Sequence, residues 1–102
     1  MDTILAIDDT KENLDILLDM LDEFDVIPVT NGFKALEIIN SEPISLILLD
    51  IVMPEMDGFE VCKILKSNPK TADIPIIFTT AKTDETSIAK AYDAGGNDYV
   101  SK

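Results

Sequence analysis

The chain has 102 residues, which is enough for one domain and too few for two. Its 20 acidic residues outnumber 8 lysines, and the net charge of −12 argues against nucleic-acid binding and against adsorption to anionic membranes. The chain contains no histidine, which excludes Ser-His triads and His-ligated metals. One cysteine, Cys62, forms no internal disulfide, and no apolar run is long enough for a membrane span, so we expect a cytoplasmic protein.

The chain begins with an apolar run followed by a helical pattern. Residues 4–7 predict a strand buried on both faces, and the run ends in Asp8 and Asp9. Leucines then recur at helical spacing over residues 14–21, with acidic residues on the other faces. We expect Asp9 or Thr10 to cap this helix.

A second strand and a second helix follow, and then the most apolar stretch of the chain. Residues 26–29 predict a strand, and its Pro28 removes a ladder donor, so we expect this strand at an edge of the sheet. Residues 31–32 open the second helix. The stretch 44–50 predicts a central strand that again ends in an aspartate, Asp50.

The second half of the chain continues the alternation. Its predicted elements are a helix capped by Asp57, a strand at 74–78 ending in Thr79-Thr80, a helix ended by Gly95-Gly96, and a short strand at Tyr99-Val100. The first of these helices carries the apolar residues Val61, Cys62, Ile64 and Leu65. Strands that alternate with helices predict an α/β fold, with a parallel sheet and right-handed crossovers.

Polar side chains follow several predicted strands, where open α/β sheets bind their ligands. These residues are Asp8, Asp9, Asp50, Thr80 and Lys102. If the first and third strands are neighbours, three carboxylates meet, and a pair ~5 Å apart repels by roughly 3 kcal/mol. Either a proton or a hard cation must compensate, and oxygen ligands alone suit Mg²⁺ or Mn²⁺. With a lysine and a hydroxyl, this set suits transfer of a phosphoryl group onto a carboxylate.

Four segments together resemble one family. They are Asp8-Asp9, the loop from Asp50 to Gly58, Thr80-Ala81, and the stretch from Asp98 to Lys102. Over its whole length, the sequence resembles the receiver domain of two-component response regulators. The resemblance implies one receiver domain over residues 1–102, with a flavodoxin-like, doubly wound, five-stranded parallel sheet of order 2-1-3-4-5.

The resemblance also implies a metal site and a phosphoacceptor. Asp50 would accept a phosphoryl group from a phosphohistidine on a partner histidine kinase or phosphotransfer protein. Asp9 and Asp50 would bind Mg²⁺ directly, together with the backbone carbonyl of Val52, and Asp8 would act through a bound water. Pro54 and Gly58 would shape the loop beside the site.

The same resemblance implies a switch. Thr80, Lys102 and the backbone N–H of Ala81 would hold phosphoryl oxygens. Tyr99 would swing inward when Thr80 moves toward the phosphoryl group, which would change the surface of the fourth helix and fifth strand for a downstream effector.

Two features depart from the family pattern. The chain ends at Lys102, before the proline and fifth helix that usually follow, so part of the sheet should be exposed. We therefore expect either a piece cut from a longer protein, or self-association or element swapping that covers this face. An apolar Val52 cannot orient an attacking water, which predicts a long-lived acyl phosphate.

Two other functions fit parts of the pattern. A phosphatase of the haloacid-dehalogenase type needs a second acid two residues after its nucleophile, and Val52 stands there. A flavodoxin-type electron carrier needs N–H and hydroxyl donors after the first strand, where Asp8 and Asp9 would repel a flavin phosphate. We therefore favour a phosphoacceptor switch that catalyses only its own phosphorylation and dephosphorylation, and is otherwise no enzyme.

Overall fold

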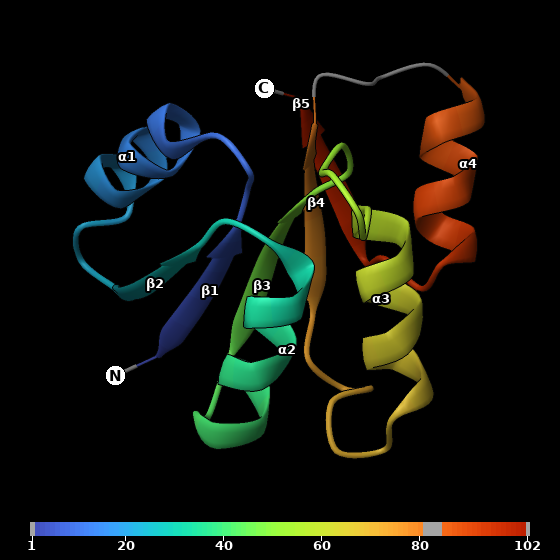
Figure 1. The fold of residues 1–102 in the computed structure, drawn as a ribbon, viewed down its shortest axis with the longest axis horizontal. Coiled ribbons are helices and arrows are strands. Elements are labelled where there is room, and N and C mark those ends of the chain that lie inside the picture. Colours follow the sequence, from blue (N-terminus) through green and yellow to red (C-terminus); the bar gives the residue numbers. More distant parts are fainter. Residues whose placement is uncertain (1, 81–84, 102) are drawn as a thin grey trace.

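Strands and helices alternate along the whole chain (Figure 1). The computed structural model describes residues 2–80 and 85–101. The elements are β1 (Thr3–Ile7), α1 (Lys11–Met20), β2 (Asp25–Val29), α2 (Gly32–Ser41), β3 (Leu46–Asp50), α3 (Gly58–Ser67), β4 (Ile76–Thr80), α4 (Glu85–Asp93) and β5 (Asp98–Ser101). The predicted alternation is confirmed.

The strands form one five-stranded parallel sheet in the order β2-β1-β3-β4-β5. This is the predicted order 2-1-3-4-5. The proline in β2, Pro28, lies opposite Ala6 of β1, and β2 is an edge strand as its missing N–H requires. The order makes β1 and β3 neighbours, so their carboxyl ends lie side by side.

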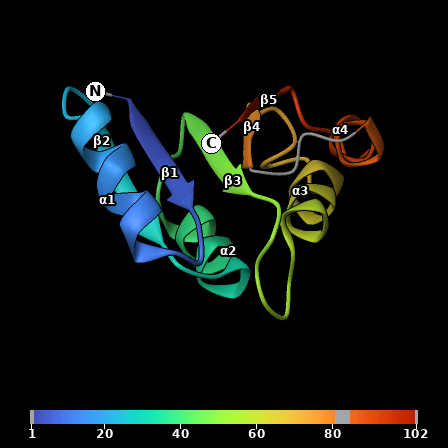
Figure 2. The same ribbon diagram turned by 90° about the horizontal axis from the view of Figure 1, so that it is seen from above.

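Helices cover the two faces of the sheet unequally. In Figure 1, α1 lies on one side of the sheet, and α2, α3 and α4 lie on the other. Both views show α3 and α4 side by side (Figure 2). The main core lies between the sheet and these three helices, and its fully buried strand residues include Leu5, Ile47, Leu49 and Phe78. Strands buried on both faces need continuous apolar sequence, as these strands have.

The face under α1 is only partly covered. Ile4 and Ala6 are buried there, whereas Val100 of β5 is 53% exposed and Met20 of α1 is 72% exposed. A hollow of about 300 Å³ lies between α1 and the ends of β4 and β5. The described residues hold four helices, so the expected absence of a fifth helix is confirmed, with exposed apolar residues beside the uncovered strands. None of the helices in this part of the chain has the length and apolar character needed to cross a bilayer.

Two strands begin two residues later than their apolar runs. The prediction extended the third strand to Ile44 and the fourth to Ile74, but β3 begins at Leu46 and β4 at Ile76. Before β4, the N–H of Ile74 donates to the carbonyl of Thr71 in a turn, and Pro75 has no N–H to donate to a neighbouring strand. Hydrogen bonding, rather than apolar character, therefore sets where the fourth strand begins.

Candidate functional site

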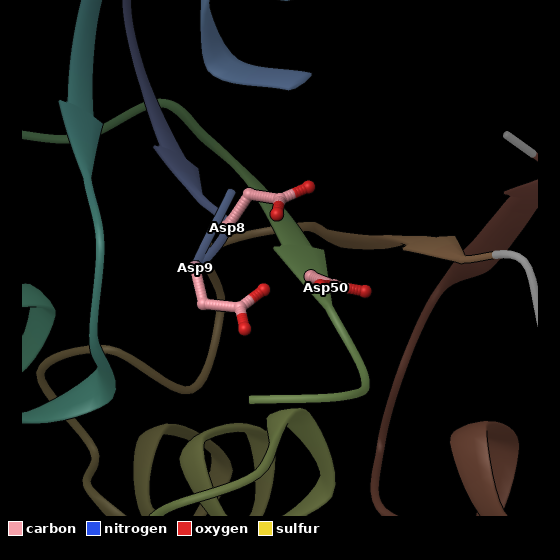
Figure 3. Close-up of side chains that lie close together, drawn as sticks. All are labelled: Asp8, Asp9 and Asp50. Atoms are coloured by element: carbon pink, nitrogen blue, oxygen red, sulfur yellow. The ribbon is translucent and has the colours of Figure 1, made fainter. Parts of the chain in front are cut away.

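Three carboxylates meet at the carboxyl ends of β1 and β3. Asp8 and Asp9 follow β1 directly, and Asp50 is the last residue of β3 (Figure 3). One oxygen from each carboxylate lies within 4.8 Å of the others. The parallel register causes this convergence, because Ile7 lies opposite Leu49 and the residues that follow both are aspartates. The convergence predicted from the sequence is confirmed.

The three carboxylates differ in their surroundings. Asp8 is 0% exposed and Asp50 is 4% exposed, whereas Asp9 faces solvent. The backbone N–H of Asp8 donates to the carbonyl of Val29 at 3.0 Å, and its Oδ1 accepts from the N–H of Thr10 at 2.9 Å. Asp8 is therefore fixed at both its backbone and its side chain.

The start of α1 differs from the prediction. We expected Asp9 or Thr10 to cap this helix, and Thr10 is its N-cap residue, but no side chain makes a capping hydrogen bond there. Instead, the Asp8 carboxylate accepts the N–H of Thr10 and turns the chain from β1 into α1. The hydroxyl of Thr10 donates to Asp9 Oδ1 at 3.4 Å. The predicted cap position at Thr10 is therefore confirmed, but the expected side-chain capping bond is absent.

The electrostatics of this cluster favour a bound cation. At 4.8 Å, two carboxylates repel by roughly 3 kcal/mol at an effective dielectric constant of about 20. Since all three candidate ligands are oxygens and two of them are buried, the donor set suits a hard divalent cation such as Mg²⁺ or Mn²⁺. The acidic cluster therefore fits a divalent-metal site.

The loop from Asp50 to α3 lies closely against the site. The N–H of Gly58 donates to the carbonyl of Ile51 at 2.9 Å, and a Cβ on Gly58 would overlap the carbonyl oxygen of Asp50. Within the loop, Glu55 has a φ of 67°, and the N–H of Met56 donates to the carbonyl of Pro54 at 2.8 Å. The loop thus forms a tight turn, and α3 begins directly against the backbone of Asp50.

The remaining predicted site residues stand as follows. The side chain of Val52 is 52% exposed in the loop after Asp50. Thr80 is the last residue of β4, but its side chain, Ala81 and Lys102 lie outside the described part of the structure. Tyr99 in β5 is half-buried against the core.

One contact of Tyr99 was not predicted. Its ring lies edge-to-face against the ring of Tyr92 in α4, with centroids 6.4 Å apart. The helical pattern of α4 gave no signal for this pairing, because a turn and a change of element separate the two residues.

Comparisons with known proteins agree with this geometry. A family model described as the response regulator receiver domain matches residues 4–102. A probable cyclic di-GMP phosphodiesterase from Vibrio cholerae is 43% identical over 101 residues, which are 98% of this chain and 23% of that protein. The transcriptional regulatory protein SpaR from Bacillus subtilis is 38% identical over 110 residues, with 100% of this chain and 46% of that protein covered.

A solved structure shares the fold over the full chain. The Mn²⁺-bound form of the response regulator Rcp1 matches with a TM-score of 0.90 and 28% identity, and the match covers 100% of this chain and 81% of that chain. The chain spans less than half the length of the two curated relatives named above. Because the family model matches nearly all of its residues and the sheet has the order that the resemblance implied, the chain belongs to the family of response regulator receiver domains.

Proposed function

We propose that this chain is a phosphoacceptor switch in which Asp50 receives a phosphoryl group from a phosphohistidine on a histidine kinase or phosphotransfer protein. The observation that carries the proposal is the meeting of Asp8, Asp9 and Asp50, with one oxygen of each within 4.8 Å of the others. Phosphoryl transfer depends mainly on positioning and charge neutralisation, and this cluster would position the acceptor and hold the cation that offsets the charge.

The proposed metal ligands are Asp9, Asp50 and the backbone carbonyl of Val52, with Asp8 acting through a water molecule. A bound Mg²⁺, or Mn²⁺ in its place, would offset much of the charge of the cluster and part of that of an incoming phosphoryl group. The Mn²⁺-bound form of a related response regulator supports a divalent cation in this family. Asp9 is the exposed member of the cluster, so it leaves the site open to solvent, while Asp8 and Asp50 are held in place by burial.

The proposed transfer forms one bond and breaks another. A carboxylate oxygen of Asp50 attacks the phosphorus, and the P–N bond of the phosphohistidine breaks, with its electron pair going to the imidazole nitrogen. Thr80, the N–H of Ala81 and Lys102 would hold the phosphoryl oxygens. Support for Thr80 comes from the sheet order, because β4 lies beside β3 and Thr80 follows the residue paired with Asp50.

The acyl phosphate would then change a surface. It adds about one negative charge and three acceptor oxygens beside the end of β4. In our proposal, Thr80 moves toward these oxygens, Tyr99 turns inward, and the altered α4–β5 surface binds a downstream partner. The protein would act on no substrate other than its own Asp50.

Intact-mass measurement after incubation with acetyl phosphate and Mg²⁺ tests this function. The wild type should gain the mass of one phosphoryl group, and Asp50→Ala should gain none. Asp19→Ala, which removes an exposed acid of α1 outside the cluster, is the matched control and should react like the wild type. The proposal fails if Asp50→Ala is phosphorylated as fully as this control. Multiple-turnover hydrolysis of a phosphomonoester would favour the phosphatase alternative instead.

A further inference from the structure

The rings of Tyr92 and Tyr99 form a T-shaped pair. Their centroids lie 6.4 Å apart and their planes meet at 84°. This edge-to-face geometry is favourable because the positive edge of one ring meets the negative face of the other. The pair connects α4 to β5, which are the two elements whose surface changes in the proposed switch.

Backbone hydrogen bonds fix both ends of this contact. At the end of α4, the N–H of Gly95 donates to the carbonyl of Tyr92 at 3.0 Å, and the N–H of Gly96 donates to the carbonyl of Ala91 at 3.0 Å. Gly95 has a φ of 102°, so these bonds close the helix in a left-handed turn. In β5, Tyr99 lies opposite Phe78 in the parallel register. With both backbones held, side-chain torsions alone decide whether the two rings touch.

The two rings differ in their surroundings. Tyr92 is 48% exposed, whereas Tyr99 is half-buried against the core. With the backbones of α4 and β5 held, turning the Tyr99 ring about its side-chain torsions would lose the present edge-to-face geometry. In our proposal, the inward position of Tyr99 lacks this contact with Tyr92.

We propose that Tyr92 is a positioning residue that holds the ring of Tyr99 in its present place and thereby sets how readily Tyr99 turns inward. The inference rests on the proposed role of Tyr99 as the switching aromatic. An edge-to-face contact between aromatic rings corresponds to roughly a two- to tenfold change in an equilibrium constant. Loss of the Tyr92 ring should therefore raise the ratio of inward to present Tyr99 conformers by about that factor.

Three variants at position 92 separate ring geometry from bulk. Tyr92→Phe keeps the ring, Tyr92→Leu keeps apolar volume without a ring, and Tyr92→Ala removes both. The sequence has two tyrosines and no tryptophan, so Tyr99 is the only tyrosine left in each variant. The χ1 rotamer populations of Tyr99, measured by NMR from three-bond scalar couplings, report its orientation directly. These populations would stay the same if the Tyr99 ring became more exposed without changing its orientation.

The variants should differ in their Tyr99 rotamer populations before any phosphorylation. Tyr92→Phe should give the wild-type populations, and both Tyr92→Ala and Tyr92→Leu should raise the minor rotamer of Tyr99 by roughly two- to tenfold. If Tyr92→Leu behaves like Tyr92→Phe, bulk rather than ring geometry positions Tyr99, and the proposal is overturned. It is also overturned if all three variants give the same populations.

A second measurement separates this inference from the proposed function. The same samples are treated with acetyl phosphate and Mg²⁺, and their intact masses are read alongside the rotamer populations. Absence of a phosphoryl mass gain in every variant would defeat the proposed function, and the role of Tyr92 in switching with it. A mass gain with rotamer populations independent of residue 92 would defeat only the role of Tyr92.

Discussion

The carbonyl oxygen of Asp50 occupies the space where a side chain on residue 58 would begin, and residue 58 is glycine. A Cβ at that position would also approach the Cα of Ile51 to 2.9 Å. The N–H of Gly58 donates to the carbonyl of Ile51 at 2.9 Å, so the end of β3 and the start of α3 touch through their backbones. The position of the proposed phosphoacceptor thus depends on the residue that begins the next helix.

Gly58→Ala should destabilise the fold by about 2 kcal/mol. Alanine gains up to ~1 kcal/mol over glycine in a helix, but here its Cβ meets backbone that cannot rotate away. Urea denaturation followed by circular dichroism measures the difference. Lys63→Ala, an exposed substitution in the same helix, is the control and should stay close to wild type. Equal free energies of unfolding for the two variants would contradict the close approach of α3 to the backbone of Asp50.

Asp9→Asn should raise the stability of the metal-free protein and remove its response to metal. Neutralising one of three carboxylates relieves repulsion, by about 1 kcal/mol after screening of the exposed Asp9 by solvent. The same change removes a proposed direct ligand, so Mg²⁺ should no longer raise the Tm. Thermal unfolding with and without MgCl₂ tests both effects, and Asp19→Asn is the control on α1. An equal Mg²⁺-induced rise in Tm for Asp9→Asn and wild type would contradict the proposed ligand set.

The sequence predicted the arrangement of the site more accurately than it predicted where the strands begin. Apolar runs ending in aspartate indicated buried parallel strands, whose carboxyl ends share one edge of the sheet. The strand order implied by the family resemblance made the first and third strands neighbours, and so brought Asp8 and Asp50 together. The edge position of β2 followed in the same way from Pro28. The strand assignments and the edge position of β2 depend on periodicity and backbone chemistry, which local sequence shows, whereas the adjacency of β1 and β3 depended on the resemblance.

Contacts between distant elements were not predictable in the same way. Lys66 of α3 donates from Nζ to the carbonyls of Ala72 and Ile74, at 3.0 and 2.9 Å, and so fixes the approach to β4. Its position on α3 gave no sign of this, since a lysine on a helix usually faces solvent. The pairing of Tyr92 with Tyr99 likewise depends on the relative placement of α4 and β5, which three-dimensional packing sets.

Val52→Asn should shorten the lifetime of the acyl phosphate. The exposed Val52 side chain lies two residues after Asp50 and carries no group that could orient an attacking water. An amide there can hydrogen-bond such a water and place it near the phosphorus, so loss of phosphate should be faster by roughly tenfold. Intact-mass spectra at intervals after removal of acetyl phosphate give the lifetime. Val52→Ile retains an apolar side chain and should decay like wild type; equal lifetimes for the Asn and Ile variants would refute the role of this position.

The Cys62 thiol should make stability fall at alkaline pH. Burial raises the pKa of this thiol above its ordinary value, an effect that nearby Lys66 partly offsets, and the thiol donates a hydrogen bond to the carbonyl oxygen of Ala94 at 3.3 Å. Above the unfolded pKa the unfolded chain loses the thiol proton while the folded chain keeps it, so ionisation favours unfolding until pH passes the folded pKa. Relative to Cys62→Ala, in which other titrating groups are unchanged, wild type should lose stability between roughly pH 8 and pH 10, as pH rises through the ordinary thiol pKa. Urea titrations of both proteins across this range measure the difference, and a gap that stays constant with pH would show that the buried thiol ionises as easily as a free one.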